Sequence, residues 1–346
     1  MSQNTESMKN QQPETNTPKM SPELSAAHAK MMAAADQVEK VIIGKRSEII
    51  QLLTAMLAGA HVLIEDVPGT GKTTLASALA KVTGLTFRRA QFTPDVMASD
   101  ITGFSIYNRQ REQFEFREGL VMCNLLLADE INRASPKTQS ALLEAMEEGK
   151  VTVDGNTMNV PDPFMVIATQ NPAGYVGTYP LPEAQLDRFA LKISMGYPHP
   201  AEEVNIIKAR RAGNPLDAVD AVLSMEELRS IRALVRDIHI DDEVYTYIVT
   251  LITATRRHPS LALGASPRAS VALVHLAQAY AFLRGRDYVQ PDDVAALFRN
   301  AIGHRLSLSQ EARLARKTSG DVLGEILRTT EVPYKGKRKS GDSADA

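Results

Sequence analysis

Cysteine, long apolar runs and net charge are all scarce in this chain. Cys123 is the single cysteine among 346 residues, which excludes an internal disulfide framework and a multi-cysteine metal site. Its place beside the apolar run at 125–127 predicts a buried structural thiol rather than a nucleophile. No apolar stretch approaches the ~18 residues of a membrane span, and the polar N-terminus lacks an apolar signal core. We therefore expect a cytoplasmic protein without a membrane span.

The overall composition is that of an ordinary globular protein. Hydrophobic residues make up 44% of the chain and charged residues 23%, and the length allows two or three domains. The formal net charge of −2 argues against a protein that holds nucleic acid by overall positive charge. We expect a disordered tail at 1–22, an α/β domain at 23–198, a region of helices only at 199–332, and a flexible tail at 333–346.

Short apolar runs alternate with helical segments between residues 61 and 197, which predicts a parallel sheet flanked by helices. The expected strands are 61–65, 86–91, 125–129, 164–169 and 191–194. Two interruptions, 101–121 and 151–160, predict β-hairpins, and the second carries an Asp154-Gly155 turn signal. Such additions to an α/β core suggest contact with a partner or substrate; decorative loops are the alternative.

A glycine-rich loop follows the first expected strand and precedes a helix. The loop consists of Asp66, Val67, Pro68, Gly69, Thr70, Gly71, Lys72, Thr73 and Thr74. Its backbone N–H groups would meet phosphate oxygens at the positive end of the helix. Lys72 would reach the β- and γ-phosphates, and the Thr73 hydroxyl would ligate Mg²⁺. Asp66 replaces the first glycine of the general pattern, yet the tight turn is kept, so we predict a nucleotide hydrolase.

Polar residues end two of the later strands. Asp129, at the end of an apolar run, can hold Mg²⁺ through water, and Glu130 would orient and deprotonate the water that attacks the γ-phosphate. Asn171 follows the strand expected at 164–169 and could hydrogen-bond the γ-phosphate or the attacking water. A turn-forming Asn before Pro172 is the alternative.

Two arginines are candidates for contact with the nucleotide. Arg188 could pair with Asp187 or a surface acid, or act as an arginine finger in the site of an adjacent subunit. Arg268 lies in the first turn of an expected helix, where the macrodipole disfavours a cation. A phosphate nearby would remove that penalty.

Taken together, these motifs resemble the MoxR family of AAA+ ATPases over about residues 25–330. The segments that carry the resemblance are Glu65–Thr73, Gln91–Asp95, Leu126–Ala134, Lys137–Met146, Ala168–Pro172 and Gly264–Arg268. The resemblance implies an AAA+ P-loop core with inserted hairpins, the helix-2 insert and the pre-sensor-1 hairpin, followed by an all-α lid. Asp66 is common in the family's own version of the loop.

The resemblance also assigns roles by position. They are Walker A for Lys72 and Thr73, Walker B for Asp129 and Glu130, sensor 1 for Asn171, the arginine finger for Arg188 and sensor 2 for Arg268. The strip Val41–Lys45, with Ile43 and Gly44, resembles the segment that packs on adenine. ATP and Mg²⁺ are the implied cofactors. The implied assembly is a homo-oligomeric ring, usually a hexamer, working as a chaperone-like remodelling ATPase with a von Willebrand factor A-domain partner on a client the sequence does not identify.

Two other classes of function stay open at this point. A nucleic-acid motor would use the same hairpins, but the tip of the second hairpin is acidic and polar, whereas a loop that follows phosphates should be basic. Arg109, Arg111 and Arg117 of the first hairpin keep that alternative open. A nucleotide-controlled scaffold with little turnover is the third class, and the complete Walker B and finger residues argue against it.

Overall fold

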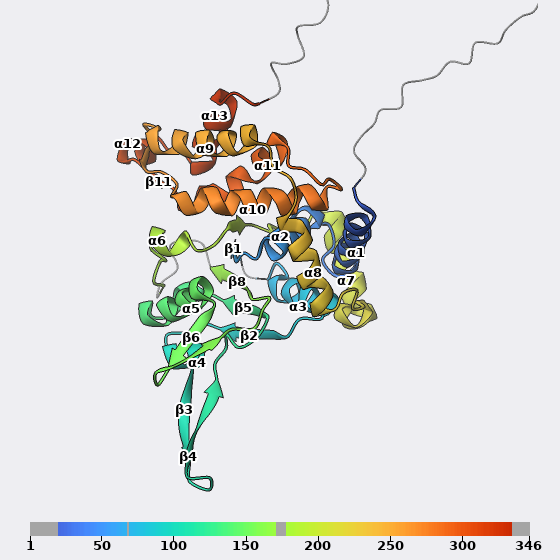
Figure 1. The fold of residues 1–346 in the computed structure, drawn as a ribbon, viewed down its shortest axis with the longest axis vertical. Helices are drawn as coiled ribbons and strands as arrows, with labels where there is room; N and C mark the ends of the chain where they lie inside the picture. Colours follow the sequence, from blue (N-terminus) through green and yellow to red (C-terminus); the bar gives the residue numbers. More distant parts are fainter. Residues whose placement is uncertain (1–19, 68, 171–177, 334–346) are drawn as a thin grey trace, which may run out of the picture.

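The computed structural model describes residues 20–67, 69–170 and 178–333, and its centre is a five-stranded parallel sheet (Figure 1). The strand order is β2 (Phe87–Gln91), β5 (Leu125–Asp129), β8 (Met165–Gln170), β1 (Val62–Glu65) and β9 (Leu191–Ile193). All five strands expected from the sequence are confirmed. Their carboxyl ends lie at one edge, where parallel sheets bind ligands.

Helices and hairpins surround this sheet. The helices of this part are α1 (Pro22–Glu39), α2 (Arg46–Ala58), α3 (Lys72–Val82), α4 (Ala98–Thr102), η1 (Ile131–Arg133), α5 (Pro136–Glu148) and α6 (Glu183–Leu186). Both expected hairpins are confirmed: β3 (Gly103–Asn108) with β4 (Gln113–Glu118), and β6 (Lys150–Val153) with β7 (Asn156–Asn159). Asp154 and Gly155 both have positive φ, as a tight two-residue hairpin turn requires. The β3–β4 hairpin projects from the body (Figure 1).

The region after β9, which we call the lid, is mainly helical. It contains α7 (Pro200–Ala212), η2 (Pro215–Ala218), α8 (Met225–Arg236), α9 (Asp242–Arg257), α10 (Pro267–Leu283), α11 (Pro291–Ile302), η3 (Gly303–Arg305), α12 (Gln310–Leu314) and α13 (Ser319–Thr329). The expectation of helices only was wrong, because β10 (Leu261–Leu263) pairs antiparallel with β11 (Ser307–Leu308). These runs are too short to show a strand period, and their pairing depends on a partner over forty residues away.

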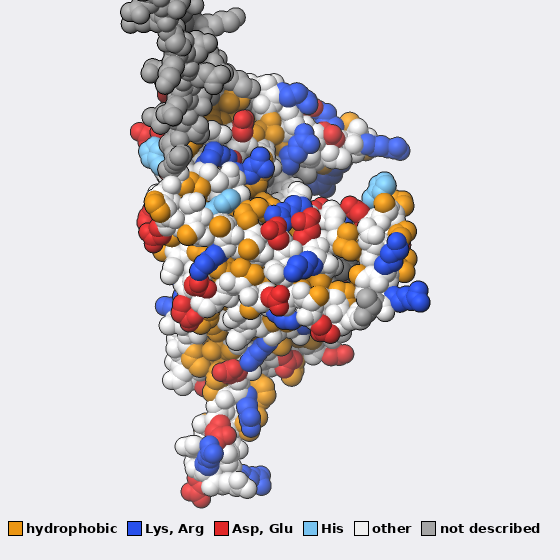
Figure 2. All heavy atoms as spheres, turned by 90° about the vertical axis from the view of Figure 1, so that its right-hand side faces the viewer, with side chains coloured by type: hydrophobic (Ala, Val, Ile, Leu, Met, Phe, Trp, Pro, Cys, Tyr) orange, Lys and Arg blue, Asp and Glu red, His pale blue; other side chains and the backbone are white. Residues whose placement is uncertain are grey.

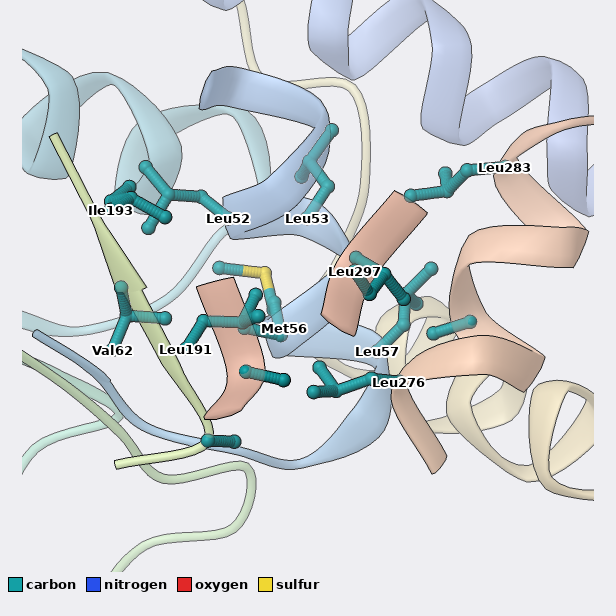
Figure 3. Close-up of a cluster of buried hydrophobic side chains, with 14 of the residues drawn as sticks. Leu52, Leu53, Met56, Leu57, Val62, Leu191, Ile193, Leu276, Leu283 and Leu297 are labelled. Atoms are coloured by element: carbon teal, nitrogen blue, oxygen red, sulfur yellow. The ribbon is translucent and has the colours of Figure 1, made fainter. Parts of the chain in front are cut away.

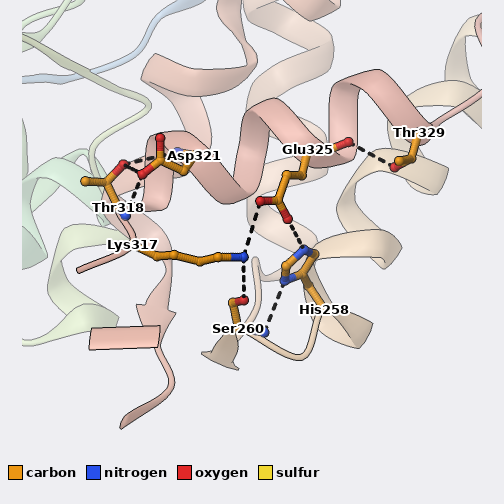
Figure 4. Close-up of polar contacts among 7 residues, drawn as sticks. All are labelled: His258, Ser260, Lys317, Thr318, Asp321, Glu325 and Thr329. Carbon is orange, nitrogen blue, oxygen red and sulfur yellow. Dashed lines mark hydrogen bonds and ion pairs between the residues drawn. The ribbon is translucent and has the colours of Figure 1, made fainter. Parts of the chain in front are cut away.

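The lid contains a polar cluster between α13 and the turn after α9 (Figure 4). The Glu325 carboxylate of α13 accepts from Lys317 Nζ at 3.2 Å and faces His258 Nε2 at 3.3 Å. His258 Nδ1 in turn accepts the Ser260 backbone N–H at 3.2 Å. These contacts join the turn after α9 to α13. Since the carboxylate and the ammonium are exposed, their pairing adds little stability.

The core is continuous between the sheet and the lid. In Figure 3, four α2 side chains lie between β1 and β9 on one side and α10 and α11 on the other. The labelled side chains are Leu52, Leu53, Met56, Leu57, Val62, Leu191, Ile193, Leu276, Leu283 and Leu297. The opposite face of the sheet packs on α5 through a second cluster, which includes Leu126, Leu142 and Phe189. The position of the lid is therefore fixed by apolar burial as well as by polar contacts.

Cys123 belongs to the second cluster. Its side chain is buried, and burial raises the pKa of the thiol to about 11. A thiol that stays protonated at neutral pH is a poor nucleophile, so the expected structural role is confirmed. Within the three described ranges, no helix is long and apolar enough to cross a membrane.

Candidate functional site

The phosphate loop connects the end of β1 to the start of α3. Gly69 and Gly71 have φ of 88° and 86°, in the left-handed region that favours glycine. A Cβ at Gly69 would meet nothing within 4 Å, so glycine is required there for its backbone angle and not for space. Pro68 lies outside the described residues. The turn leaves the N–H groups at the start of α3 free of intrahelical partners, which suits an anion.

Asp66 anchors the start of this loop. Its buried carboxylate accepts three backbone N–H groups: Val67 at 2.8 Å, and Met195 and Gly196 at 2.7 Å each. The last two follow β9, so one side chain joins the loop to the neighbouring strand. This role explains why a carboxylate stands where the general pattern has glycine, since a glycine offers no acceptor.

Lys72 begins α3 and points back into the loop. Its Nζ donates to Val67 O at 2.8 Å. Burial lowers the pKa of Lys72, and the negative charges of Asp66, Asp129 and Glu130 oppose that shift. The structure therefore brings the loop lysine together with both acids at the end of β5. Thr73 and Thr74 follow in the first turn of α3.

Asp129 is held by two side chains. Its Oδ1 accepts from Thr169 Oγ1 at 2.9 Å, and its Oδ2 accepts from Arg89 Nε and Nη2 at 3.0 and 2.8 Å. The Thr73 hydroxyl and the Asp129 carboxylate are hard oxygen donors, which fit Mg²⁺. No group of three or more His, Cys, Asp or Glu residues in the described ranges could hold a metal ion. Nucleotide phosphates and water would complete the coordination, as is usual for Mg²⁺.

Glu130 has an unusual backbone. Its φ of 56° and ψ of 47° are left-handed, which is uncommon for a non-glycine residue and occurs often at functional sites. Its N–H donates to Thr169 Oγ1 at 2.9 Å, and its carboxylate pairs with Arg133 at 3.0 Å. Thr169 therefore contacts both acids, a role that the sequence analysis missed. The parallel pairing of β5 with β8 places Thr169 beside the end of β5. Asn171 lies outside the described residues.

The strip expected to pack on adenine lies beside the loop. Ile42 is buried, and its Cδ1 would be 3.9 Å from a Cβ on Gly71. Ile43 and Gly44 follow, and Gly44 has a φ of 74° with the Glu202 side chain of α7 directly against its Cα. Bulk at Gly44 would collide with that carboxylate. The strip, the loop and α7 thus meet at one place.

Arg188 and Arg268 lie together, away from the phosphate loop. Arg188 Nε is 2.8 Å from Glu147 Oε2, and Arg268 Nη2 contacts the other oxygen of the same carboxylate. Of the two pairings considered for Arg188, the surface acid is the one observed. Both arginines line a cavity of about 520 Å³ with Ala58, Gly59 and His61, which immediately precede β1. The loop follows the other end of β1, roughly 13 Å further on.

Comparisons with known proteins agree with this geometry. Residues 61–191 match the model of the ATPase family associated with various cellular activities (AAA), and residues 253–326 match the AAA lid domain. The chain is 50% identical over 306 residues to the uncharacterised protein YeaC of Bacillus subtilis, covering 88% of this chain and 96% of YeaC. It is 41% identical to chaperone MoxR1 of Mycobacterium tuberculosis, covering 86% and 81%. A crystal structure from Cytophaga hutchinsonii superposes with a TM-score of 0.85 at 37% identity, covering 90% and 97%.

Proposed function

Because the chain belongs to the MoxR family of AAA+ ATPases, we propose that it binds ATP with Mg²⁺ and hydrolyses it between neighbouring copies of itself in a ring. One observation carries this proposal. Each copy has the loop and the acids at one end of β1 and a pair of arginines at the other end, so no single copy has both halves together.

One copy supplies the half that holds the nucleotide. The N–H groups of Gly69 to Thr73 and the Lys72 ammonium bind the phosphates, and Ile43 and Gly44 receive the adenine. Mg²⁺, held through Thr73 and Asp129, would neutralise charge on the β- and γ-phosphates. Glu130 orients a water and takes one of its protons while the water oxygen bonds to the γ-phosphorus and the bond from the γ-phosphorus to the bridging oxygen breaks. The products are ADP and phosphate.

The next copy supplies the two arginines. Arg188 and Arg268 hydrogen-bond the γ-phosphate and stabilise the charge of the transition state. The surface beside them suits contact with another subunit, since Val271 is 58% exposed and lines the same cavity as Pro267 and Ala272. Contact between two different faces of the same protein forms a closed ring when the rotation permits.

Arg188→Ala and Arg268→Ala test this division of the site. Each variant keeps its own loop, so ATP binds with unchanged affinity. Hydrolysis falls by up to ~10³–10⁵-fold for the finger. Arg284→Ala, an exposed arginine at the far end of α10, is the matched control and keeps wild-type turnover. Wild-type hydrolysis by Arg188→Ala would contradict the proposal.

We also propose a chaperone-like role with a von Willebrand factor A-domain partner, in line with the family and with the name of MoxR1. The β3–β4 hairpin is the element that would engage a protein, because Phe104, Ile106, Tyr107 and Phe114 are exposed on it. Figure 2 shows this hairpin projecting from the body, with charges of both signs at its tip. Arg111 at the tip pairs with Glu115, which weakens the case for phosphate contact.

Affinity capture from the native cell tests this role. Glu130→Gln in ATP holds the nucleotide without rapid turnover, whereas Lys72→Ala does not bind it. ATP-dependent recovery of a von Willebrand factor A-domain protein with Glu130→Gln alone supports the proposal. Recovery of DNA-bound factors would favour the nucleic-acid motor instead. Hydrolysis that DNA stimulates with a steep salt dependence would confirm that alternative.

A further inference from the structure

Asp187 contacts both segments that carry the arginines. It directly precedes Arg188, and its Oδ2 accepts from Ser266 Oγ at 2.8 Å. Ser266 is the N-cap of α10 and stands two residues before Arg268. One carboxylate thus joins the end of α6, in the α/β part, to the first turn of the lid helix that presents the second arginine.

A buried arginine of the lid contacts the same segment. Arg305 of η3 is 3% exposed, and its Nη1 lies 3.1 Å from Asp187 Oδ1. Its Nη2 donates to Phe189 O at 2.9 Å, and His304 Nε2 lies 2.7 Å from the same carbonyl. Arg188 is therefore flanked on both sides by residues that the lid holds.

The pairing of Asp187 with Arg305 has an electrostatic cost. Burial lowers the pKa of Arg305, and Asp187 is the charge that opposes this shift. The Nη1–Oδ1 contact is a charge attraction without hydrogen-bond geometry, and Nε also lacks a hydrogen-bond partner among the described residues. A buried ion pair with unmet donors is a poor source of stability, so a functional reason for it is expected.

We infer that Asp187, with Arg305 and Ser266, is a positioning residue that holds Arg188 and Arg268 at one fixed separation for the phosphate of the neighbouring copy. The inference rests on the proposed hydrolysis between copies. Both arginines have long side chains and come from different parts of the fold. A displacement of about 1 Å at a reacting centre can cost ~10²-fold in rate, so a rigid link between their backbones matters.

Asp187→Asn tests the inference. It keeps the shape and an acceptor for Ser266 but removes the charge that faces Arg305. Since its phosphate loop is intact, ATP affinity stays at the wild-type value while kcat falls by ~10²-fold. Mixing with Lys72→Ala subunits restores hydrolysis, because the Lys72→Ala subunit offers an intact arginine pair to the Asp187→Asn site. In a random mixture of equal amounts, about one interface in four pairs the loop of an Asp187→Asn subunit with the arginines of a Lys72→Ala subunit. General misfolding would not be rescued in this way.

Two further variants keep the test decisive if Asp187→Asn does not fold. Ser266→Ala removes one contact of Asp187, together with the cap bond from the Ala269 N–H at 3.4 Å, and should lower kcat by ~10-fold without changing ATP affinity. Gln51→Ala is the matched control, because it removes a different contact between the lid and α2, Asn300 Nδ2 to Gln51 Oε1 at 2.5 Å, and neither residue lines the cavity that contains the arginines. It keeps wild-type kcat.

Arg188→Ala mixed with Lys72→Ala separates hydrolysis between copies from the positioning role of Asp187. If Lys72→Ala does not rescue Arg188→Ala, hydrolysis between copies is wrong and the inference falls with it. If Lys72→Ala rescues Arg188→Ala but Asp187→Asn keeps wild-type kcat, only the positioning role is wrong. Where Asp187→Asn does not fold, wild-type kcat in Ser266→Ala leads to the same conclusion. A loss of ATP affinity in Asp187→Asn, or its failure to recover in the mixture, would also overturn that role.

Discussion

At the scale of single residues, the site combines groups that are adjacent in one motif with groups that meet only across the fold. Lys72, Asp129 and Glu130 could be found because each follows an apolar strand at a fixed spacing. Glu147 and Thr169 could not be found in this way. Glu147 meets Arg268 across 121 positions, and a lone acid near the end of a helix has no signature. The contacts of Thr169 could be predicted only from the order of the strands in the sheet, which the pattern of apolar runs does not give.

Asp66 gives the first prediction at this scale. Asp66→Gly restores the general loop pattern but removes the acceptor of three backbone N–H groups. We expect the free energy of unfolding to fall by about 2–4 kcal/mol and ATP to bind more weakly, because the loop loses its link to the end of β9. Urea unfolding and an ATP titration measure the two effects. A variant as stable as wild type would show that the carboxylate is not an anchor.

His61 gives a prediction for pH. Burial lowers its pKa from 6.5 to about 4. Its Nδ1 accepts the Val166 N–H at 3.0 Å and its Nε2 faces Met146 O at 3.1 Å, so the folded protein needs the neutral ring. The unfolded chain binds a proton near pH 6.5 and the folded chain does not. Stability therefore falls as pH drops from 6.5 to about 4, by up to roughly 3 kcal/mol from this residue.

Urea unfolding of wild type and His61→Gln between pH 7.5 and 5 checks the sign of this pH dependence. His61→Gln should be less stable at pH 7.5 and should lose less stability as pH falls. Some slope will remain, because burial also lowers the pKa of His304, to about 3. Parallel curves for the two proteins would contradict the assignment of His61 as a buried neutral histidine.

At the scale of elements, apolar runs and turn signals were sufficient to predict the strands of the sheet and both hairpins. The inner strands β5 and β8 are buried on both faces, so each reads as a short apolar run, and the Asp154-Gly155 turn marked the second hairpin. The β10–β11 pair was missed because its stability comes from tertiary contact. The expected roles of the hairpins depend on what binds them, which the fold alone does not determine.

The β3–β4 hairpin can be removed to test its role. Gly103 and Glu118 face each other in register, so an Asn-Gly turn can replace residues 104–117. The side chains removed belong to neither core cluster, so we expect the melting temperature to change by less than ~3 °C and basal hydrolysis to persist. Partner capture by Glu130→Gln should be lost. Phe114→Ser, with the hairpin intact, should weaken capture as well; capture unchanged in both would exclude the hairpin as the docking element.

At the scale of the whole molecule, the division of the site makes activity a property of the assembly. A site completed by a second copy requires contact between copies. Hydrolysis per subunit should therefore rise with protein concentration and level off as assembly, followed by sedimentation, becomes complete. Activity per subunit that stays constant while the protein dissociates to monomers would mean that one copy suffices.

A structure of Glu130→Gln with ATP and Mg²⁺ tests the central claim most directly. Our account predicts that Arg188 and Arg268 leave Glu147 and that both contact the γ-phosphate held by Lys72 of the adjacent copy. Arginines that stay on Glu147 beside a fully bound ATP, or an Arg268 that reaches the nucleotide of its own chain, would contradict it.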